Sequence, residues 1–527
     1  MYLLSFVVAS WSSRGLLGDV ASWSSRGLLG DPTPLQKELD EAIGEGLPSF
    51  SLNRSEVYIQ GASSLLIKAK DFSLIGNNAT IVFAPGYGVV FQESTGVVAQ
   101  DLTVTFDPPS FTQGRLVAAA GRTFDILIDS GFPLPNASFF TSVETKLQFF
   151  DPSTRLRPAQ SGSCIVTVIG EESPGVWRVE TAPSFSCDLP PGIPVDSLLA
   201  TLSSRIFSFG YQIPSGYRGG AWWIFNSSRC TTLNVTLLGS SNFAFSEWGG
   251  DGGHVYDTVT LTRAPGHLLS SNTDGFHSFS TGVGPTISNS ALSFMGDDVM
   301  NIHNRVGLVL QTPINDDAVL VIDVGDTPTP QGNPAFPARA LADVIPGQDA
   351  LLISPPRPGS PSRGGGALKV ATAAWVTDAT LVAAAVAYMK DRGGVPVDPL
   401  AVGVWNFSLP GTRVAGVAAG DIVQFDRRAG SGGRVSGCTF SDAYDSCFRL
   451  QASGTLLAGN SYARIPGGIS ISFDPDWLEG SSDIQGVQLL DNVFQDVLWP
   501  HAKEFSQILS VGSGVKNVST FNNTVLP

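Results

Sequence analysis

The side chains most able to carry out chemistry are concentrated between residues 245 and 305. The strings FSEWGGDGGH, SSNTDGFHSF and GDDVMNIHNR fill much of this stretch and hold three of the five histidines of the chain. Carboxyl and imidazole groups gathered in this way are the usual means of general acid–base catalysis. We therefore take as catalytic candidates Asp274, Asp297 and Asp298, and as substrate-binding candidates Glu247, Trp248, His277, His303 and Arg305.

The spacing of the aspartates predicts that they share one groove. Asp274 and Asp297 are 297 − 274 = 23 residues apart, about one coil of a parallel β-helix. Residues one coil apart stack about 4.8 Å from each other. Side chains alternate along a strand, but Gly296 favours a turn at which Asp297 and Asp298 can share a direction.

Three neighbouring carboxylates cannot all ionise easily. At least one pKa should rise, and the three groups should titrate as a coupled set. Glycoside hydrolysis needs this division between a protonated acid and an ionised base. For an inverting reaction we expect the acid and the base ~6.5–9.5 Å apart, with Asp274 and Asp298 as a diagonal pair and Asp297 holding the water. Each aspartate also fits a plain turn role, and His277 and His303 fit equally well as hydrogen-bond partners of the coil backbone.

A second pair of candidates lies further along the chain. Arg449 in CFRLQA and Glu479 in DPDWLEG are expected on the same face as the aspartates, as substrate-binding groups. A surface salt bridge, which contributes little to stability, is the alternative interpretation.

The elements that must position these residues are short strands separated by turns. LLIKA (65–69), FSLIG (72–76), ATIVFA (79–84) and LTVTF (102–106) follow closely, and the pattern resumes after residue 230. No helix-length segment separates them, which argues against a βαβ fold, although a β-sandwich also has many short strands. We predict an all-β protein: a right-handed parallel β-helix with two β-rich insertions and a short N-terminal capping helix within residues 31–45.

The expected organisation follows from where the strand rhythm breaks. Residues 1–31 contain a perfect duplication of VASWSSRGLLGD and form an N-terminal segment, a possible targeting remnant. The remaining divisions are first coils with the cap at 32–115, an inserted β subdomain at 116–211, coils with the candidate site at 212–307, a second β-rich insertion at 308–433, and C-terminal coils at 434–527.

Composition excludes several functions. The net charge is −15, the apolar fraction is 43% and charged residues make up 15% of the chain. This composition is not that of a disordered protein. The acidic balance argues against binding to nucleic acid or to anionic membranes. No apolar run reaches the ~18 residues that a membrane span needs.

The cysteines and the N-glycosylation sequons give information on where in or outside the cell the protein resides. No CxxC motif occurs among the five cysteines, and Cys164 and Cys187 are close enough in sequence to be bridged. A short apolar run near the N-terminus resembles the core of a signal peptide. Together with eight N-x-S/T sequons it indicates a secreted or cell-wall protein. The sequons are at Asn53, Asn78, Asn136, Asn226, Asn234, Asn406, Asn517 and Asn522.

The motifs NTDG (272–275) and GDD (296–298) resemble the signature of pectin-lyase-fold glycoside hydrolases, including the family 28 polygalacturonases. The longer strings DGFHSF and GDDVMNIH are similar to family 110, the exo-acting α-galactosidases, whose β-helix carries inserted barrels. The resemblance implies inversion, with Asp274, Asp297 and Asp298 as the catalytic aspartates. Neither the GHG nor the RIK-like motif of family 28 follows at the expected places, which favours a neutral galactoside over a uronate.

The sequence thus predicts an inverting glycoside hydrolase that acts on an oligo- or polysaccharide, with no cofactor and no metal. One alternative is a polysaccharide lyase, with Ca²⁺ on Asp297 and Asp298 and with Arg263 or Arg305 as the base. The other is a non-catalytic β-helix that binds glycans or has a structural role. The oligomeric state stays open.

Overall fold

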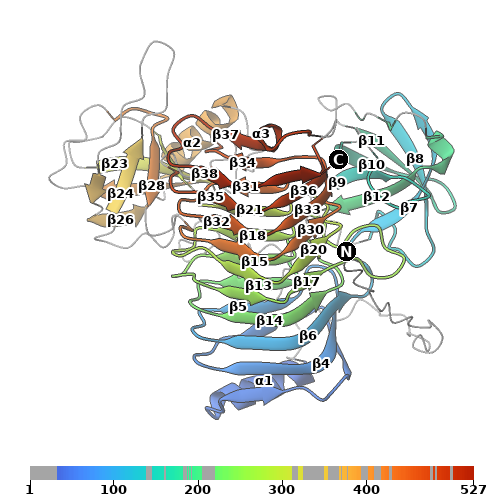
Figure 1. The fold of residues 1–527 in the computed structure, drawn as a ribbon, viewed down its shortest axis with the longest axis horizontal. Coiled ribbons are helices and arrows are strands. Elements are labelled where there is room, and N and C mark those ends of the chain that lie inside the picture. The colour runs from blue at the N-terminus through green and yellow to red at the C-terminus, as the bar shows by residue number, and fades with distance from the viewer. Residues whose placement is uncertain are drawn as a thin grey trace.

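Short strands stack in parallel along the molecule, as Figure 1 shows. The computed structural model describes residues 33–526 except 138–144, 159–161, 182–186, 188, 191–192, 205–219, 305, 311–317, 325–348, 354–366, 370, 377, 393–401, 409–416, 426–429, 475–478, 481–483 and 499–501. The duplicated segment at 1–31 and the candidate Arg305 lie outside the described residues.

Two parallel sheets form the coils. The sheet that carries the candidate site, called the site sheet here, has nine strands: β3 (Leu65–Ile67), β5 (Val89–Gln92), β13 (Trp222–Phe225), β15 (Phe245–Trp248), β18 (Phe276–Phe279), β21 (Met300–His303), β31 (Phe448–Leu450), β34 (Ile469–Ile471) and β37 (Leu509–Val511). The prediction of an all-β, right-handed parallel β-helix is confirmed, since each coil returns to pair in parallel with the coil before it.

The second sheet has seventeen strands and closes the rest of each coil. They are β1 (Ser49–Ser51), β2 (Val57–Gly61), β4 (Ser73–Phe83), β6 (Val98–Phe106), β14 (Thr231–Leu237), β16 (Val255–Asp257), β17 (Thr260–Leu261), β19 (Thr286–Ser288), β20 (Ala291–Ser293), β29 (Arg434–Ser436), β30 (Thr439–Ser441), β32 (Leu456–Ala458), β33 (Ser461–Ile465), β35 (Gln488–Leu490), β36 (Val493–Val497), β38 (Ser519–Phe521) and β39 (Thr524–Leu526).

Alternation along each strand of the site sheet decides what faces the interior. One inward row places large apolar side chains in register on successive coils: Trp222, Phe245, Phe276, Met300 and Phe448. The row two positions further along continues with Ile224, Ile302 and Leu450. Because side chains point alternately to the two faces of a strand, the intervening positions of the site sheet face outward.

The first coil is covered by α1 (Pro34–Gly44), as the sequence predicted. Thr33 Oγ1 accepts a hydrogen bond from the Gln36 backbone N–H, and Pro34 occupies the first turn, where no donor is needed. The buried Gln36 side chain donates to the Leu66 carbonyl oxygen and accepts from the Leu66 N–H. It thereby satisfies the edge of β3, which would otherwise be open to pairing.

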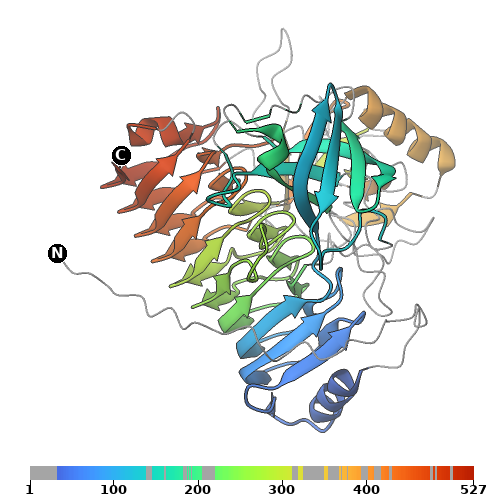
Figure 2. The same ribbon diagram turned by 90° about the vertical axis from the view of Figure 1, so that its right-hand side faces the viewer.

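Two insertions leave the coils beside the candidate site. The first forms a closed barrel of β7 (Thr112–Ala120), β8 (Thr123–Ile128), β9 (Thr145–Phe150), β10 (Cys164–Ser173), β11 (Val176–Thr181) and β12 (Leu199–Ser204), with a short 3₁₀ turn at Val195–Ser197. Cys164 and Cys187 form a disulfide in it. Figure 2, in which the barrel faces the viewer, shows it in front of the coils.

The second insertion lies on the other side of the coils in Figure 1. It contains β22 (Gly307–Val309), β23 (Ala318–Val324), β24 (Asp349–Ile353), β25 (Ala367–Lys369), β26 (Thr372–Trp375), α2 (Ala379–Arg392), β27 (Val402–Ser408) and β28 (Ile422–Phe425). A short helix, α3 (Phe505–Ile508), precedes the last strand of the site sheet. No helix among the described residues is both long and apolar enough to cross a membrane.

Candidate active site

Asp274 lies at the end of a buried polar turn that leads into β18. Asn272 Nδ2 donates to the Ser110 carbonyl oxygen over 2.8 Å, and Thr273 Oγ1 donates to Asn242 Oδ1 over 3.0 Å. Because these groups are buried and hydrogen-bonded to neighbouring segments, the turn has one well-defined geometry. NTDG therefore fixes the direction of the Asp274 side chain.

The strand register sets which aspartate faces Asp274. Phe276 of β18 pairs with Met300 of β21, an offset of 300 − 276 = 24 residues. Asp274 is thus in register with Asp298, and the Gly275 N–H donates to the Asp298 carbonyl oxygen over 3.0 Å. The expectation of a 23-residue coil with Asp298 as the diagonal partner was wrong. The diagonal neighbour is Asp297.

The three aspartates come together. One carboxylate oxygen from each lies within 4.8 Å of the others, and Asp274 and Asp298 are buried whereas Asp297 is partly exposed. The expected separation of ~6.5–9.5 Å between acid and base is wrong for these oxygens, which lie closer together. The physical reason is the 24-residue register, which stacks Asp274 directly on Asp298.

Asp298 is the member of this group that favours the protonated state. Burial raises its pKa well above the usual range, and the negative charges of Asp445 and Asp297 raise it further. Asp298 Oδ1 accepts a hydrogen bond from the Ser446 N–H over 2.9 Å. This contact orients the carboxyl group, and its other oxygen can carry a proton.

Asp297 is paired with a cation from the inserted barrel. Lys146 on β9 places its ammonium nitrogen against Asp297 Oδ2. Two residues along the same strand, Gln148 Nε2 donates to the Gly296 carbonyl oxygen over 2.8 Å. Lys146 and Gln148 share one face of β9, so the barrel holds the GDD turn by two contacts.

A fourth carboxyl group, Asp445, was not found from the sequence. Its N–H donates to the Asp297 carbonyl oxygen over 3.1 Å, which places the residue on the next coil in register with Asp297. Burial raises the pKa of Asp445, and the charge of Asp297 adds to this effect, while Lys146 opposes it. The second insertion separates Asp445 from GDD, so no local spacing could have indicated it.

His277 and His303 form a chain of contacts that starts at Asp274. His277 Nδ1 is 2.6 Å from Asp274 Oδ2, and His277 Nε2 is 2.9 Å from His303 Nε2. His303 Nδ1 is 3.0 Å from the Asn304 carbonyl oxygen. Both histidines are buried, and both point outward from the site sheet.

Arg449 and Glu479 lie on the same outward face. Arg449 is in register with Asn301, the outward residue that follows His277 on the next coil. Its Nη2 is 2.6 Å from Asp474 Oδ2 and 3.4 Å from Glu479 Oε2. Burial lowers the pKa of Arg449, but the charges of Glu479 and Asp298 outweigh this and raise it overall.

Glu247 does not belong to this face. It lies in the inward row between Ile224 and Ser278, is fully buried, and accepts hydrogen bonds from Ser278 Oγ over 2.6 Å and from Tyr256 Oη over 3.3 Å. The interpretation of Glu247 as a substrate-binding residue is therefore wrong. Strand alternation sends it into the interior when its neighbour Trp248 faces outward.

Trp248 faces outward but is covered. It stacks on Phe279 with ring centroids 4.8 Å apart and packs with Trp223 and Phe225 in a buried aromatic cluster. Only 5% of its surface is exposed, so it supports the coil beneath the histidines instead of offering an open stacking surface.

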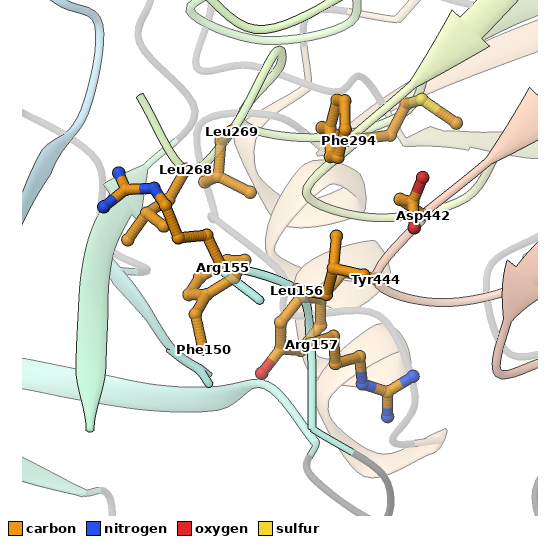
Figure 3. Close-up of a pocket in the computed structure, with 10 residues that line it drawn as sticks. Phe150, Arg155, Leu156, Arg157, Leu268, Leu269, Phe294, Asp442 and Tyr444 are labelled. Carbon is orange, nitrogen blue, oxygen red and sulfur yellow. The ribbon is translucent and has the colours of Figure 1, made fainter. Parts of the chain in front are cut away.

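A small cavity marks the junction of the barrel and the coils (Figure 3). It has a volume of about 10 Å³, room for roughly one water molecule. Its lining contains two arginines and one aspartate, and the other side chains are mostly apolar: Phe150, Arg155, Leu156, Arg157, Leu268, Leu269, Phe294, Met295, Asp442 and Tyr444. The cavity is too small for a sugar. Arg263, the lyase base considered above, packs on the Phe294 ring at 3.9 Å.

Oxygens within 4.8 Å of one another could hold a divalent cation. Here, however, the Lys146 ammonium already neutralises Asp297, and Asp298 favours its protonated form. With no cation bound, these two features suit the group to proton chemistry, and a divalent cation would have to displace the Lys146 ammonium and the Asp298 proton.

Comparison with known proteins gives only distant similarity. No family model matches the chain, and no curated protein is significantly similar. Among solved structures, one described as a glycoside hydrolase has a TM-score of 0.30 and 7% identity over 93% of this chain and 92% of its own. The Streptococcus pneumoniae surface protein and adhesin PfbA has a TM-score of 0.32 and 8% identity over 95% and 97%. The mannuronan C-5 epimerase A-module of Azotobacter vinelandii has a TM-score of 0.23 and 8% identity over 93% and 92%. The function must accordingly be argued from the site.

Proposed function

We propose that this protein is an inverting glycoside hydrolase that acts on neutral, galactoside-like glycans. The observation that carries the proposal is the trio of aspartates within 4.8 Å, of which Asp298 favours the protonated form. Hydrolysis of a glycosidic bond requires a proton donor for the leaving oxygen and ionised carboxylate for the attacking water. The trio supplies both.

Asp298 is the general acid in this scheme, and Asp274 and Asp297 hold the water. A water that donates two hydrogen bonds of about 2.8 Å bridges acceptors roughly 4.6–4.8 Å apart. One oxygen of each aspartate lies within 4.8 Å of the others, a spacing that allows such a bridge. These oxygens are closer than the ~6.5–9.5 Å usual between the acid and the base of an inverting enzyme. We therefore base the proposed inversion on the number of carboxylates, because a retaining reaction uses one acid and one nucleophile and leaves the third aspartate without a role.

The charges around the site favour an uncharged substrate. Among the described residues, the cations Lys146 and Arg449 are engaged by carboxylates. Asp445, Asp474 and Glu479 add further negative charge. A polyanionic glycan would be repelled by this arrangement. The resemblance of NTDG and GDD to the β-helix hydrolases leads to the same proposal, and the Cys164–Cys187 disulfide suits a secreted protein.

The experiment is a screen of neutral and uronic-acid glycans for released sugar, with wild type and Asp298→Asn compared. Asn keeps the shape but cannot donate the proton, so kcat on the active substrate should fall by roughly a hundred- to ten-thousandfold. Asp251→Asn, which changes an exposed aspartate in the same stretch of sequence, is the matched control. Unsaturated products together with loss of activity in EDTA would instead establish the lyase. Glycan binding without turnover would establish a binding protein.

A further inference from the structure

The hydrogen-bond chain from Asp274 to Asn304 limits where protons can lie. The Asn304 carbonyl oxygen can only accept, so His303 Nδ1, at 3.0 Å, carries a proton and donates it. His303 Nε2 and His277 Nε2 are 2.9 Å apart, and one proton lies between them. The carboxylate oxygen Glu479 Oε1 is 3.7 Å from His303 Nε2, beyond hydrogen-bond distance. In a neutral His303 the Nε2 atom accepts, and His277 Nε2 is the donor.

The other nitrogen of His277 then faces Asp274. The distance of 2.6 Å from His277 Nδ1 to Asp274 Oδ2 is that of a short, charge-assisted hydrogen bond. The Phe243 ring stacks on the imidazole with centroids 3.9 Å apart, an arrangement that stabilises a cation through the ring face. Both contacts favour a His277 that is protonated on both nitrogens.

We propose that His277 is a positioning residue, held as an imidazolium between the Asp274 carboxylate and neutral His303, and that it keeps Asp274 ionised and correctly oriented as a base. The inference rests on the proposed function for its catalytic consequence. Asp274 and Asp298 lie in register, so two chemically identical side chains receive opposite protonation states from their different neighbours. His303 acts one step further away, because its fixed tautomer makes it an acceptor for His277.

The charged and titratable groups of the cluster that contains His277 come from several elements, and of these Asp274 and His303 contact His277 directly. They are Asp274 before β18, Asp297 and Asp298 before β21, His303 on β21, Arg449 on β31, Glu479 and Asp474 after β34, Lys146 on β9 and Asp445 before β31. Negative groups predominate in this set, which also favours a cationic imidazole.

Nitrogen-15 NMR of histidine-labelled protein tests the protonation state directly, since the chain has five histidines. His277→Gln identifies the signal. In wild type the His277 nitrogens should both remain of the protonated type to pH 8, well above the ordinary histidine pKa of about 6.5. A His277 that loses its proton at that ordinary pKa, or a signal showing His303 as the imidazolium, would overturn the proposal.

Two substitutions at His303 separate positioning from general structural damage. Gln offers an amide oxygen that accepts from His277, so His303→Gln should keep the imidazolium signal and most of kcat. Leu offers no acceptor, so His303→Leu should lower kcat roughly ten- to a hundredfold and shift the acidic limb of the pH profile. Equal effects of Gln and Leu on kcat, pH profile and NMR would contradict the role.

The NMR result is independent of turnover. An imidazolium signal in a protein that hydrolyses no glycan would mean that the proposed function fails while the proton assignment stands. Inverting hydrolysis by a protein whose His277 is neutral would mean the reverse.

Discussion

Replacement of the interior carboxyl group, Glu247→Gln, should stabilise the protein by an amount that grows with pH. Burial raises the pKa of Glu247 from its ordinary 4.5 to about 8, even though hydrogen bonds from Ser278 and Tyr256 act in the opposite direction. Below pH 4.5 the group is protonated in both the folded and unfolded states. Between these two pKa values only the unfolded state loses the proton, so the free energy of unfolding of the wild type falls as pH rises.

The magnitude follows from the two pKa values. Their difference, 8 − 4.5 = 3.5, corresponds to about 5 kcal/mol once pH exceeds 8. At pH 7 the loss is about 3 kcal/mol by the same relation. Gln is neutral at every pH and similar in shape, so the variant escapes this loss.

The assay is denaturant unfolding of wild type and Glu247→Gln at pH 4.5, 6 and 7.5. Glu38→Gln, which changes an exposed glutamate on α1, serves as the control. We expect the gap between wild type and Glu247→Gln to widen steadily with pH, the control to show no such trend, and KM to stay within about twofold. A gap that does not depend on pH, or a large rise in KM, would refute the placement of Glu247 in the interior.

Three further results are expected. Activity should decline at high pH as Asp298 loses its proton, because the raised pKa of Asp298 sets the basic limb of the pH–rate profile. Asp445→Asn removes a nearby negative charge and should move that basic limb to lower pH. A basic limb that stays in place would contradict the electrostatic coupling between Asp445 and Asp298. Lys146→Met should lower kcat about tenfold or more while Lys146→Arg retains most of it, since the cation holds Asp297 in the ionised form that water activation needs; equal losses in the two variants would show that charge is not what matters. Arg449→Ala should raise KM more than it lowers kcat if the residue orients substrate, and unchanged kinetics would remove it from the site.

The fold was predictable because local sequence patterns indicate its short strands, its turns and its first helix. Closely spaced β-branched and aromatic segments indicated stacked coils, and the apolar stripe of Leu35, Leu39 and Ile43 indicated the helix that covers the first coil. NTDG and GDD identified the three aspartates, since both motifs belong to tight turns that immediately precede strands of one sheet.

The strand register between β18 and β21, and the residues that distant segments bring to the site, were not predictable from local patterns. A coil can contain 23 or 24 residues with little change in pattern, and that single residue decides whether Asp297 or Asp298 faces Asp274. Lys146 reaches the site because a barrel folds back onto the coils, a contact that leaves no trace in local sequence. Glu247 is different, since strict alternation with Trp248 could have revealed that both cannot face outward.

The stereochemistry of the first product tests the central claim most directly. Proton NMR during early turnover of the active glycan should show the inverted anomer before mutarotation, because in the proposed reaction Asp274 and Asp297 direct water to the sugar while Asp298 protonates the leaving oxygen. Early accumulation of the retained anomer, or a glycosyl group trapped on one of the aspartates, would contradict this account.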